Sequence, residues 1–356
     1  MRLPDIWLFL PASLLSLLGL IVTYSIAPND FFSQLMFVIM GLIFFILINQ
    51  LDIKVIEVFT PYFYGLAILI LILTLLIGKN IRGSTRWLGI GRLQFQTSEI
   101  IKPILILALC SGLKKLDPRH FSSLLVAITV TLVPAFLVFI QPDLGSSIII
   151  GITGIFMLLS FRFPLKYYLI SSFMFLITAY LVLTNLAPYQ SKRMQTYLNP
   201  GTDPLGASYN QIQAIITVGS GQLFGKGLGK GSQSHLWFLP EKQTDFFFAS
   251  LSEEFGFIGS FGVVLLNSVL LGRLLILAIL SQDKQDMALF IGVFILLLSQ
   301  TFIHIGINIG LLPVTGLPLP FLSVGGSSMV VSWVAVALAS CWAKQLKART
   351  CLYLKF

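Results

Sequence analysis

The stretch LPEKQTDFFF, residues 239–248, ends the longest polar segment of the sequence and leads directly into an apolar run. Asp245 stands at this boundary, beside three phenylalanines. Two interpretations are open. Aspartate is a favoured residue at the N-cap of a helix, and a partly desolvated carboxylate can act as a proton acceptor. The choice between them depends on the remainder of the chain.

The composition excludes a soluble globular protein. Of the 356 residues, 56% are hydrophobic and 10% are charged, and the mean hydropathy is +0.91, whereas soluble domains carry roughly 25% charged residues. The net charge of +9 indicates contact with anionic membrane lipids. No basic tract with interleaved aromatic residues predicts nucleic-acid binding, and the cysteines have neither metal-ligand nor disulfide spacing.

Apolar runs of spanning length recur along the whole chain. A spanning helix needs about 20 apolar residues, and within lipid a helix satisfies its own backbone groups. We therefore predict an all-α, polytopic membrane protein, a single domain over residues 1–356 with about ten transmembrane helices. The predicted spans are 6–26, 31–50, 61–78, 98–113, 122–140, 146–162, 165–185, 247–272, 287–309 and 322–342.

Lysine and arginine in the short connections favour a topology with both termini in the cytoplasm. Two connections are longer, 79–97 and 186–246, and both then lie outside, the second as a long extracytoplasmic loop between spans seven and eight. The first of them carries cations on the side that the positive-inside rule disfavours. These cations are Lys79, Arg82, Arg86 and Arg92. They indicate either a phosphate ligand or contact with the outer leaflet of the membrane.

Several ionisable residues fall near or within the predicted spans. Glu99 and Lys102 are three residues apart on one helix face, as a structural ion pair or as the lining of a polar cavity. Asp143 is predicted to be a helix N-cap. Glu253 and Glu254 enter a span and need partners, for which Lys102 or an outer-loop arginine is a candidate.

The long loop contains glycines at nearly alternate positions from 219 to 231. They indicate either a backbone nest that binds phosphate or a flexible loop. Apolar residues within 208–218 have helical spacing and predict a short helix at the membrane interface. His304, alone on an apolar helix, is predicted to be a core histidine with satisfied hydrogen bonds.

A series of motifs, in order along nearly the whole chain, carries a resemblance to a known family. They are GSTRW at 83–87, FQTSEIIK at 95–102, QPDLGS at 141–146, LNP at 198–200 with DP at 203–204, LPE at 239–241 with TDF at 244–246, EE at 253–254 with Gly256, GLLP at 310–313, PFLS at 320–323 and GGSS at 325–328. On these motifs the chain resembles the SEDS family (shape, elongation, division and sporulation), to which RodA, FtsW and SpoVE belong.

The resemblance implies a peptidoglycan glycosyltransferase that polymerises lipid II at the outer face of the bacterial cytoplasmic membrane. It also implies a role in cell elongation and shape or in division, and a class B penicillin-binding protein as the transpeptidase partner. The short stretch before the first span is more like the elongation branch, which is RodA-like.

The resemblance also assigns roles to residues of this sequence. The essential acid of the family matches Asp245, a general base for the attacking sugar hydroxyl. No metal ligands are predicted, although a divalent cation, Mg²⁺ or Mn²⁺, could assist at the pyrophosphate. From the charge that develops on the leaving pyrophosphate we expect cations to bind the substrate, and Trp87 could either stack on a sugar or anchor at the membrane interface, which is the commoner role. Residues expected to bind the substrate are Arg86, Trp87, Glu99, Lys102, Arg193 and Lys242, and those expected to support the site are Asp143, Glu253, Glu254, Gly325 and Gly326.

The sequence departs from the family pattern at four positions. Thr97 stands in place of proline, Gln243 of histidine, His304 of asparagine and Val324 of tyrosine. None of these changes removes Asp245, but Gln243 lies two residues from it and bears on the tuning of the site.

Two other functions fit part of the sequence. A lipid II flippase would also use many spans and intramembrane charges such as Glu99 and Lys102. A flippase needs polar groups at both faces, however, and the polar segments gather on the predicted outer side. A membrane scaffold that holds the transpeptidase is the third possibility.

Overall fold

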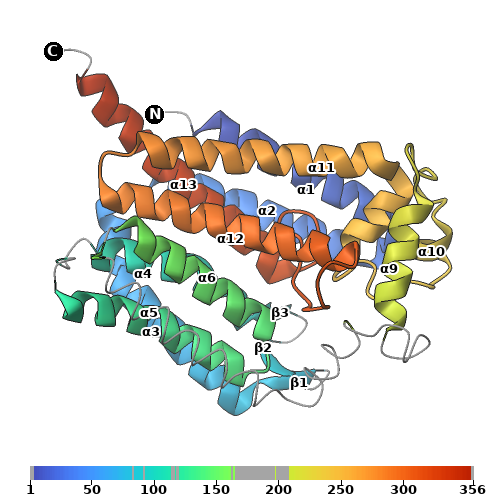
Figure 1. The fold of residues 1–356 in the computed structure, drawn as a ribbon, viewed down its shortest axis with the longest axis horizontal. Helices are drawn as coiled ribbons and strands as arrows, with labels where there is room; N and C mark the ends of the chain where they lie inside the picture. The colour runs from blue at the N-terminus through green and yellow to red at the C-terminus, as the bar shows by residue number, and fades with distance from the viewer. Residues whose placement is uncertain are drawn as a thin grey trace.

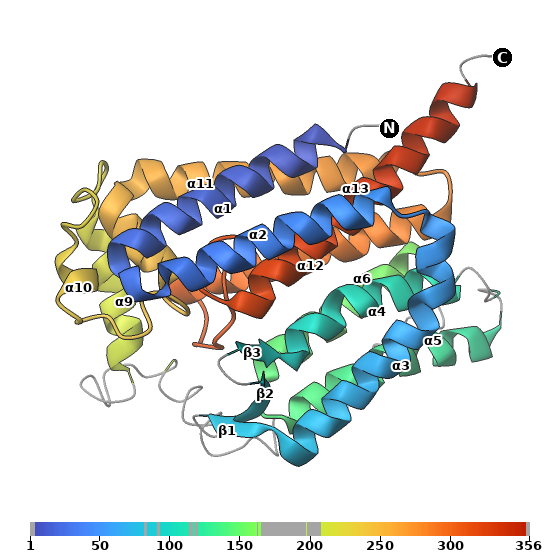
Figure 2. The same ribbon diagram turned by 180° about the vertical axis from the view of Figure 1, so that it is seen from behind.

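The computed structural model describes residues 4–81, 84–90, 93–113, 117, 120–161, 163–164, 197 and 208–353. Its long helices form an elongated bundle (Figures 1 and 2). The elements, in chain order, are α1 (Ile6–Ile26), α2 (Pro28–Gln50), α3 (Ile53–Ile77), β1 (Lys79–Ile81), β2 (Ser84–Ile90), β3 (Leu93–Gln96), α4 (Thr97–Leu113), α5 (Phe121–Ile140), α6 (Leu144–Ser160), α9 (Tyr209–Ser220), α10 (Ser232–His235), α11 (Phe247–Leu280), α12 (Lys284–Asn308) and α13 (Gly326–Tyr353).

The helices confirm a polytopic membrane protein. In the part of the chain that the structure describes, 7 helices are long and apolar enough to cross a membrane, namely α1, α2, α3, α5, α11, α12 and α13. The predicted spans α4 and α6 are helices of 17 residues each. The predicted span at 165–185 lies outside the described residues, so the number of ten spans stays a prediction.

Short polar residues fix where several helices begin. The Asp5 and Asp52 carboxylates accept hydrogen bonds from the amides of Trp7 and Lys54, at 3.2 and 3.0 Å, and so cap α1 and α3. Helix α3 therefore begins at Ile53, well before the predicted start at 61, and Pro61 lies inside it. The predicted span covered only the apolar run, whereas the helix also includes the preceding turns with Lys54 and Glu57.

The C-terminal helix forms the centre of the bundle. Residues 326–346 of α13 are the most buried of the candidate spans, and α13 packs along α2. Trp333 is fully buried. Its ring contacts those of Phe9, Phe45 and Phe321, with centroids 5.6 to 5.9 Å apart. These aromatic contacts join α1, α2 and the segment before α13 to one core.

The connection at 79–97 is a small antiparallel sheet with the order β1-β2-β3. Trp87 pairs with Gln96, Leu88 with Phe95, and Ile90 with Leu93. The all-α prediction is wrong at this place. Charged residues and glycines made the segment look like an irregular loop, whereas backbone pairing between β2 and β3 orders it and leads directly into α4 at Thr97.

The termini and the polar segments lie at opposite ends of the bundle. Helix α1 begins and α13 ends at one end, and the sheet, α9 and α10 lie toward the other (Figure 1). The helix predicted within 208–218 is confirmed as α9; its place at a membrane interface stays a prediction. The polar segments therefore gather at one end, as expected, and its assignment to the cell exterior stays a prediction.

Candidate functional site

Asp245 lies one residue before the N-cap of α11. The N-cap position is held by Phe246 and the helix begins at Phe247, so the interpretation of Asp245 as the N-cap is wrong. Phe246, Phe247 and Phe248 are buried, with exposed fractions of 1%, 0% and 5%. Asp245 itself is half-buried. The half-buried Asp245 thus lies next to buried aromatic side chains and remains accessible to solvent or to a ligand.

Two other segments hold the backbone around Asp245. The side chain of Asn308, at the end of α12, donates to the Asp245 carbonyl at 3.2 Å. The Ser323 hydroxyl donates to the Thr244 carbonyl at 3.0 Å, and the Val324 amide donates to the Gln243 carbonyl at 2.9 Å. Three consecutive carbonyls are therefore fixed from outside the loop, which holds the backbone that carries the Asp245 side chain.

The segment at 319–326 is itself anchored to α2. Gln34 donates from Nε2 to the Ser323 carbonyl at 3.0 Å, while the Ser323 hydroxyl accepts from the Leu319 amide at 2.9 Å. Gly326 lies so close to Phe37 that a Cβ at this position would stand 2.3 Å from ring carbons. Glycine at 326 thus permits the close approach to α2, and the supporting role expected for Gly325 and Gly326 stays a prediction.

Glu99 and Lys102 form the ion pair that their spacing predicts. Lys102 Nζ lies 2.5 Å from Glu99 Oε1, and each side chain is 1% exposed. Gln300 of α12 contacts the other carboxylate oxygen of Glu99 at 3.4 Å. The pair lies in the first two turns of α4, directly after the sheet, and is almost completely removed from water.

Asp143 caps α6, as predicted, and also joins α6 to the sheet. Its Oδ1 accepts from the Ser146 amide at 3.3 Å, and its Oδ2 accepts from Gln96 Nε2 at 2.8 Å and Ser98 Oγ at 2.7 Å. The Gln96 amide in turn donates to Ser327 of α13 at 3.4 Å. One carboxylate therefore ties three elements of the site together.

Glu253 is bound by the loop that precedes α11. It accepts hydrogen bonds from Lys226 Nζ at 2.8 Å, from the amides of Gln233 and Ser234 at 2.9 Å each, and from the Ser234 hydroxyl at 2.7 Å. Of the two candidate partners, Lys102 or an outer-loop arginine, Lys102 is wrong because it pairs with Glu99, and the cation found at Glu253 is the loop lysine Lys226. A fully buried carboxylate with this many donors holds the loop against the helix.

Glu254 has a different set of partners. Its Oε1 contacts the Ser25 hydroxyl of α1, the Gly229 amide at 3.1 Å and His235 Nε2 at 3.0 Å. Glu254 thus joins α1, the glycine-rich segment and α10. Both glutamates therefore bind the loop, and their predicted role in supporting the site stays a prediction.

The glycines of this loop serve close packing against a break in α11. Gly256 has φ 67° and interrupts the helix, and the amides of Lys226 and Gly227 donate to the carbonyls of Glu253 and Glu254 at 2.9 and 3.0 Å. A Cβ on Gly225 would stand 2.1 Å from the Glu254 carbonyl oxygen. The amides of Lys226 and Gly227 are therefore already bonded within the protein and do not serve a phosphate.

Lys242 is turned into the loop. It is 3% exposed, donates to the Ser234 carbonyl at 2.5 Å and lies 4.3 Å from the centre of the Trp237 ring. Burial lowers the pKa of Lys242, and the charge of Glu254 acts in the opposite direction. These contacts show how the loop holds Lys242, and its predicted contact with substrate stays a prediction.

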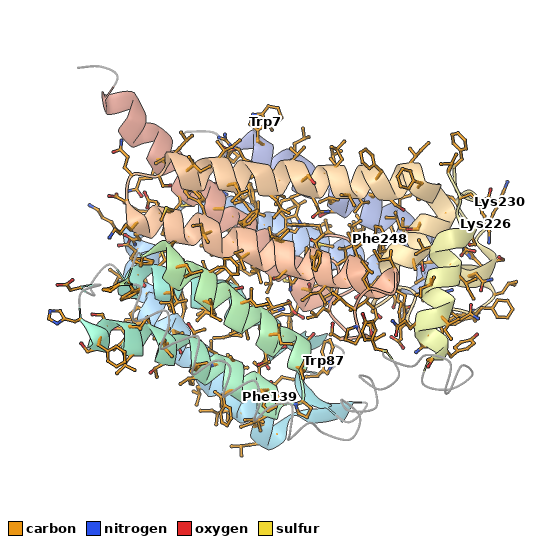
Figure 3. The ribbon with its side chains drawn as sticks, in the orientation of Figure 1. Trp7, Trp87, Phe139, Lys226, Lys230 and Phe248 are labelled. Carbon is orange, nitrogen blue, oxygen red and sulfur yellow. The ribbon has the colours of Figure 1, made fainter. Side chains whose placement is uncertain are left out.

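The remaining predicted residues are placed only in part. Trp87 lies on the sheet, toward the same end of the bundle as Phe248 in the first turn of α11 (Figure 3). Arg86 belongs to β2, next to Trp87, and Arg193 lies outside the described residues. Within the described ranges no three His, Cys, Asp or Glu side chains gather as a metal-ion site, and the divalent cation stays a sequence-based prediction.

Sequence reasoning missed the uncharged residues that hold the charged ones. These are Gln34, Gln96, Gln300, Asn308 and Ser323. For Gln300 and Asn308 the sequence contained a usable pattern, because with His304 they place a polar side chain at every fourth residue of the apolar helix α12. That histidine is buried, as predicted, and donates from Nδ1 to the Leu317 carbonyl at 2.7 Å, but its Nε2 has no partner among the described residues.

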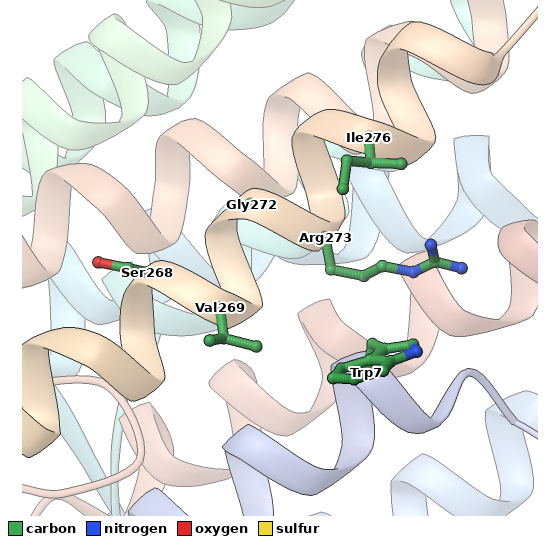
Figure 4. Close-up of a pocket in the computed structure, with 6 residues that line it drawn as sticks. All are labelled: Trp7, Ser268, Val269, Gly272, Arg273 and Ile276. Atoms are coloured by element: carbon green, nitrogen blue, oxygen red, sulfur yellow. The ribbon is translucent and has the colours of Figure 1, made fainter.

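A separate hollow lies at the far end of α11. Its volume is about 410 Å³, and Trp7 and Arg273 face it from α1 and α11 (Figure 4). Arg273 is paired there with Asp5, at 2.6 Å. Because it lies near the start of α1, this hollow is remote from Asp245 and is not part of the candidate site.

Fold and site together define a class: a polytopic helical membrane protein with a network of buried polar residues at one end. Comparison with known proteins agrees. Residues 6–347 match the family model of FtsW, RodA and SpoVE, described as cell cycle proteins. The chain belongs to this family.

Individual relatives cover most of the chain. It is 36% identical over 296 residues to the peptidoglycan glycosyltransferase MrdB of Escherichia coli K12, covering 82% of this chain and 80% of the relative. It is 35% identical over 351 residues to the stage V sporulation protein E of Bacillus subtilis strain 168, covering 94% and 95%.

Solved structures share the fold. A chain from a peptidoglycan synthase complex that coordinates polymerization and crosslinking superposes with a TM-score of 0.82 and 27% identity, covering 97% of this chain and 99% of that one. A mutant of the rod shape-determining protein RodA of Thermus thermophilus gives a TM-score of 0.74 and 25% identity, with the same coverage.

Proposed function

We propose that this protein is a peptidoglycan glycosyltransferase that polymerises lipid II at the outer face of the bacterial cytoplasmic membrane, with Asp245 as its catalytic base. The observation that carries the proposal is the environment of Asp245. This carboxylate is half-buried beside an aromatic wall, and its backbone is held by α12 and by the segment before α13. Relatives named as peptidoglycan glycosyltransferases support the reaction class.

The chemistry requires a base on the acceptor sugar. The Asp245 carboxylate takes the proton from the acceptor hydroxyl as its oxygen attacks the anomeric carbon of the donor. The bond from that carbon to the pyrophosphate oxygen breaks, and the lipid pyrophosphate leaves with the electron pair. Direct attack inverts the anomeric centre. A positioned base contributes about 10²- to 10⁴-fold to the rate of such a step.

Cations near the site stabilise the leaving pyrophosphate. Arg86 and Lys102 are the candidates from β2 and α4, and Arg193 and Lys242 are candidates from the long loop. Lys102 already neutralises Glu99 at 2.5 Å, so the pair as a whole is nearly neutral. Arg86, next to Trp87 in β2, is therefore the first candidate for the pyrophosphate, because a guanidinium binds such groups bidentately.

The direct test is polymerisation of purified lipid II in detergent micelles by the Asp245→Asn protein. We expect a loss of about 10²-fold or more in kcat, with an unchanged unfolding temperature. The matched control is Asp283→Asn. Asp283 is exposed at the start of α12, away from Asn308 at the other end of that helix, which contacts Asp245. An Asp245→Asn protein that polymerises at the normal rate would disprove the assignment.

The same assay separates the enzyme from a lipid II flippase. Micelles offer no second leaflet, so glycan chains form there only if the protein catalyses the transfer. The names of the relatives favour the enzyme over the transporter.

We infer that the partner is a class B penicillin-binding protein. Support comes from the similarity to a chain of a peptidoglycan synthase complex that couples polymerization to crosslinking. Copurification of the native complex with a tagged chain should recover a transpeptidase. Reporter fusions to the two termini, which we place in the cytoplasm, test the orientation.

A further inference from the structure

Three polar residues form one row along the buried face of α12. Gln300, His304 and Asn308 are spaced by four residues, so they lie above one another on the helix. Their exposed fractions are 2%, 0% and 0%. Polar side chains buried in a spanning helix need hydrogen-bond partners, and each of these three has a different one.

The row contacts three separate parts of the site. Gln300 reaches Glu99 of the buried ion pair at 3.4 Å. His304 donates to the Leu317 carbonyl, in the segment before α13, at 2.7 Å. Asn308 donates to the Asp245 carbonyl at 3.2 Å. One rigid helix face therefore sets these three parts relative to one another.

The Asn308 side chain makes two further hydrogen bonds besides the one to Asp245. Its Nδ2 also donates to the His304 carbonyl at 2.8 Å, and its Oδ1 accepts from the Ala249 amide at 2.9 Å. Ala249 is the third residue of α11, whose N-cap, Phe246, makes no side-chain cap bond. The first amides of a helix lack partners within the helix, and a cap oxygen normally binds the amide of the second or third residue. Asn308 thus caps α11 from a neighbouring helix.

We propose that Asn308 is a positioning residue for Asp245. Its side chain binds both the carbonyl of Asp245 and the first turn of α11. Through Gln300 on the same helix face, α12 also fixes these groups relative to the Glu99–Lys102 pair. This inference rests on the proposed function of Asp245. A side chain that fixes the backbone on both sides of the base controls the direction of the carboxylate toward the acceptor hydroxyl.

The test compares variants of Asn308 in the lipid II polymerisation assay. Asn308→Ala removes the hydrogen bonds to Asp245 and Ala249. We expect kcat to fall about 10- to 100-fold, since small displacements of a reacting group lower the rate by this much. The KM for lipid II should change less than about 2-fold. Asn308→Asp keeps the oxygen for Ala249 but replaces the donor with a second oxygen, which repels the Asp245 carbonyl. It should show the same separation of kcat from KM.

The matched control is Thr301→Val on another face of the same helix. Thr301 is buried, with its hydroxyl 3.5 Å from Asn267 of α11, so this change removes a buried polar group without contact to Asp245. It should lower the unfolding temperature and leave kcat unchanged. A purely structural role for Asn308 would give the same result as Thr301→Val.

Three outcomes would overturn one or the other conclusion. If Asp245→Asn abolishes polymerisation while both folded Asn308 variants keep kcat within about 2-fold of the unmodified protein, Asn308 does not position the base. A kcat loss in those variants that is matched by an equal rise in KM would also rule out a positioning role. If Asp245→Asn is active, the proposed function itself fails, whatever the Asn308 variants show.

Discussion

The buried glutamates at the site end of the bundle are each matched by several donors. Glu99 contacts Lys102 and Gln300, and Glu253 accepts from Lys226, Gln233 and Ser234. Removal of charges from water is costly, and good geometry with additional hydrogen bonds compensates for it. Removal of one member of such a group therefore leaves a buried charge without its partner and destabilises the fold.

The Glu99–Lys102 pair gives a first prediction. Glu99→Gln or Lys102→Met alone should lower the free energy of unfolding by about 3–5 kcal/mol, because each leaves an uncompensated buried charge. The double variant should lose less than either single variant. Thermal unfolding in detergent measures all three, and additive losses would contradict the prediction.

Lys242 gives a prediction about pH. Burial lowers the pKa of this amine in the folded protein from its ordinary value of 10.5. Between the lowered pKa and 10.5 the unfolded chain holds a proton that the folded protein has released, so stability rises with pH across this window. Unfolding in detergent over an alkaline pH series that ends at 10.5 should show this rise.

Lys242→Met should remove that part of the rise. The control is Lys230→Met, a change at an exposed lysine of the same loop, which should retain it. An identical pH slope for both variants would show that burial of Lys242 has no such effect.

Local spacing predicts a contact well when both partners lie on one helix. The pair at positions 99 and 102 and the cap at Asp143 follow from the sequence in this way. The partner of Glu253 does not, since Lys226 is far from it in sequence and reaches it only because the loop folds back on α11. Asn308 was missed for the same reason.

At the scale of elements, the break in α11 is the main feature. A straight helix from Phe247 to Leu280 would be about 50 Å long, well beyond the roughly 30 Å hydrocarbon core. The left-handed backbone at Gly256 divides it into a buried first part and a spanning part. The amides of Phe257 and Ile258 donate to the carbonyls of Gln222 and Leu223, at 2.8 and 3.2 Å, which satisfies groups that the break leaves open.

Glycine at 256 should therefore be indispensable. Alanine there would hold a strained φ and place its Cβ 2.2 Å from the Gly225 amide nitrogen. We expect Gly256→Ala to lower the free energy of unfolding by on the order of 3 kcal/mol. Gly262→Ala in the same helix, where a Cβ meets nothing within 4 Å, should be neutral or stabilising by about 0.5–1 kcal/mol. Equal thermal unfolding of the two variants would refute this account.

Element prediction succeeded where hydrophobic length alone decides. The starts and ends of α1, α5 and α12 lie within a few residues of the predicted spans. It failed at 79–97, where strand pairing between β2 and β3 orders a segment of weak local pattern. Residue composition does not reveal such pairing, because its stability comes from the neighbouring strand.

At the scale of the whole molecule, the two ends of the bundle have separate roles. At the end with the termini, Arg273 binds Asp5 at 2.6 Å, the Asp5 amide donates to Ser340 at 3.2 Å, and Lys344 donates to the Asn49 carbonyl at 2.9 Å. This cluster joins α1, α2, α11 and α13. The candidate site lies at the other end.

Stability and activity should therefore be separable. Arg273→Met leaves the fully buried Asp5 carboxylate without its cation, and we expect a loss of on the order of 3 kcal/mol in unfolding free energy with kcat unchanged below the unfolding temperature. Lys54→Met, at an exposed lysine, is the control for loss of a positive charge. A large drop in kcat for the folded Arg273 variant would show that the two ends are coupled.

The pairing of residues 222–227 with the break in α11 has a practical consequence for protein engineering. In a chimera between members of this family, a loop grafted without the first turns of its own helix would meet a backbone shaped for another sequence. The boundary of the exchanged segment should therefore lie after the break, near residue 260. The loop and the part of α11 before the break are then exchanged together.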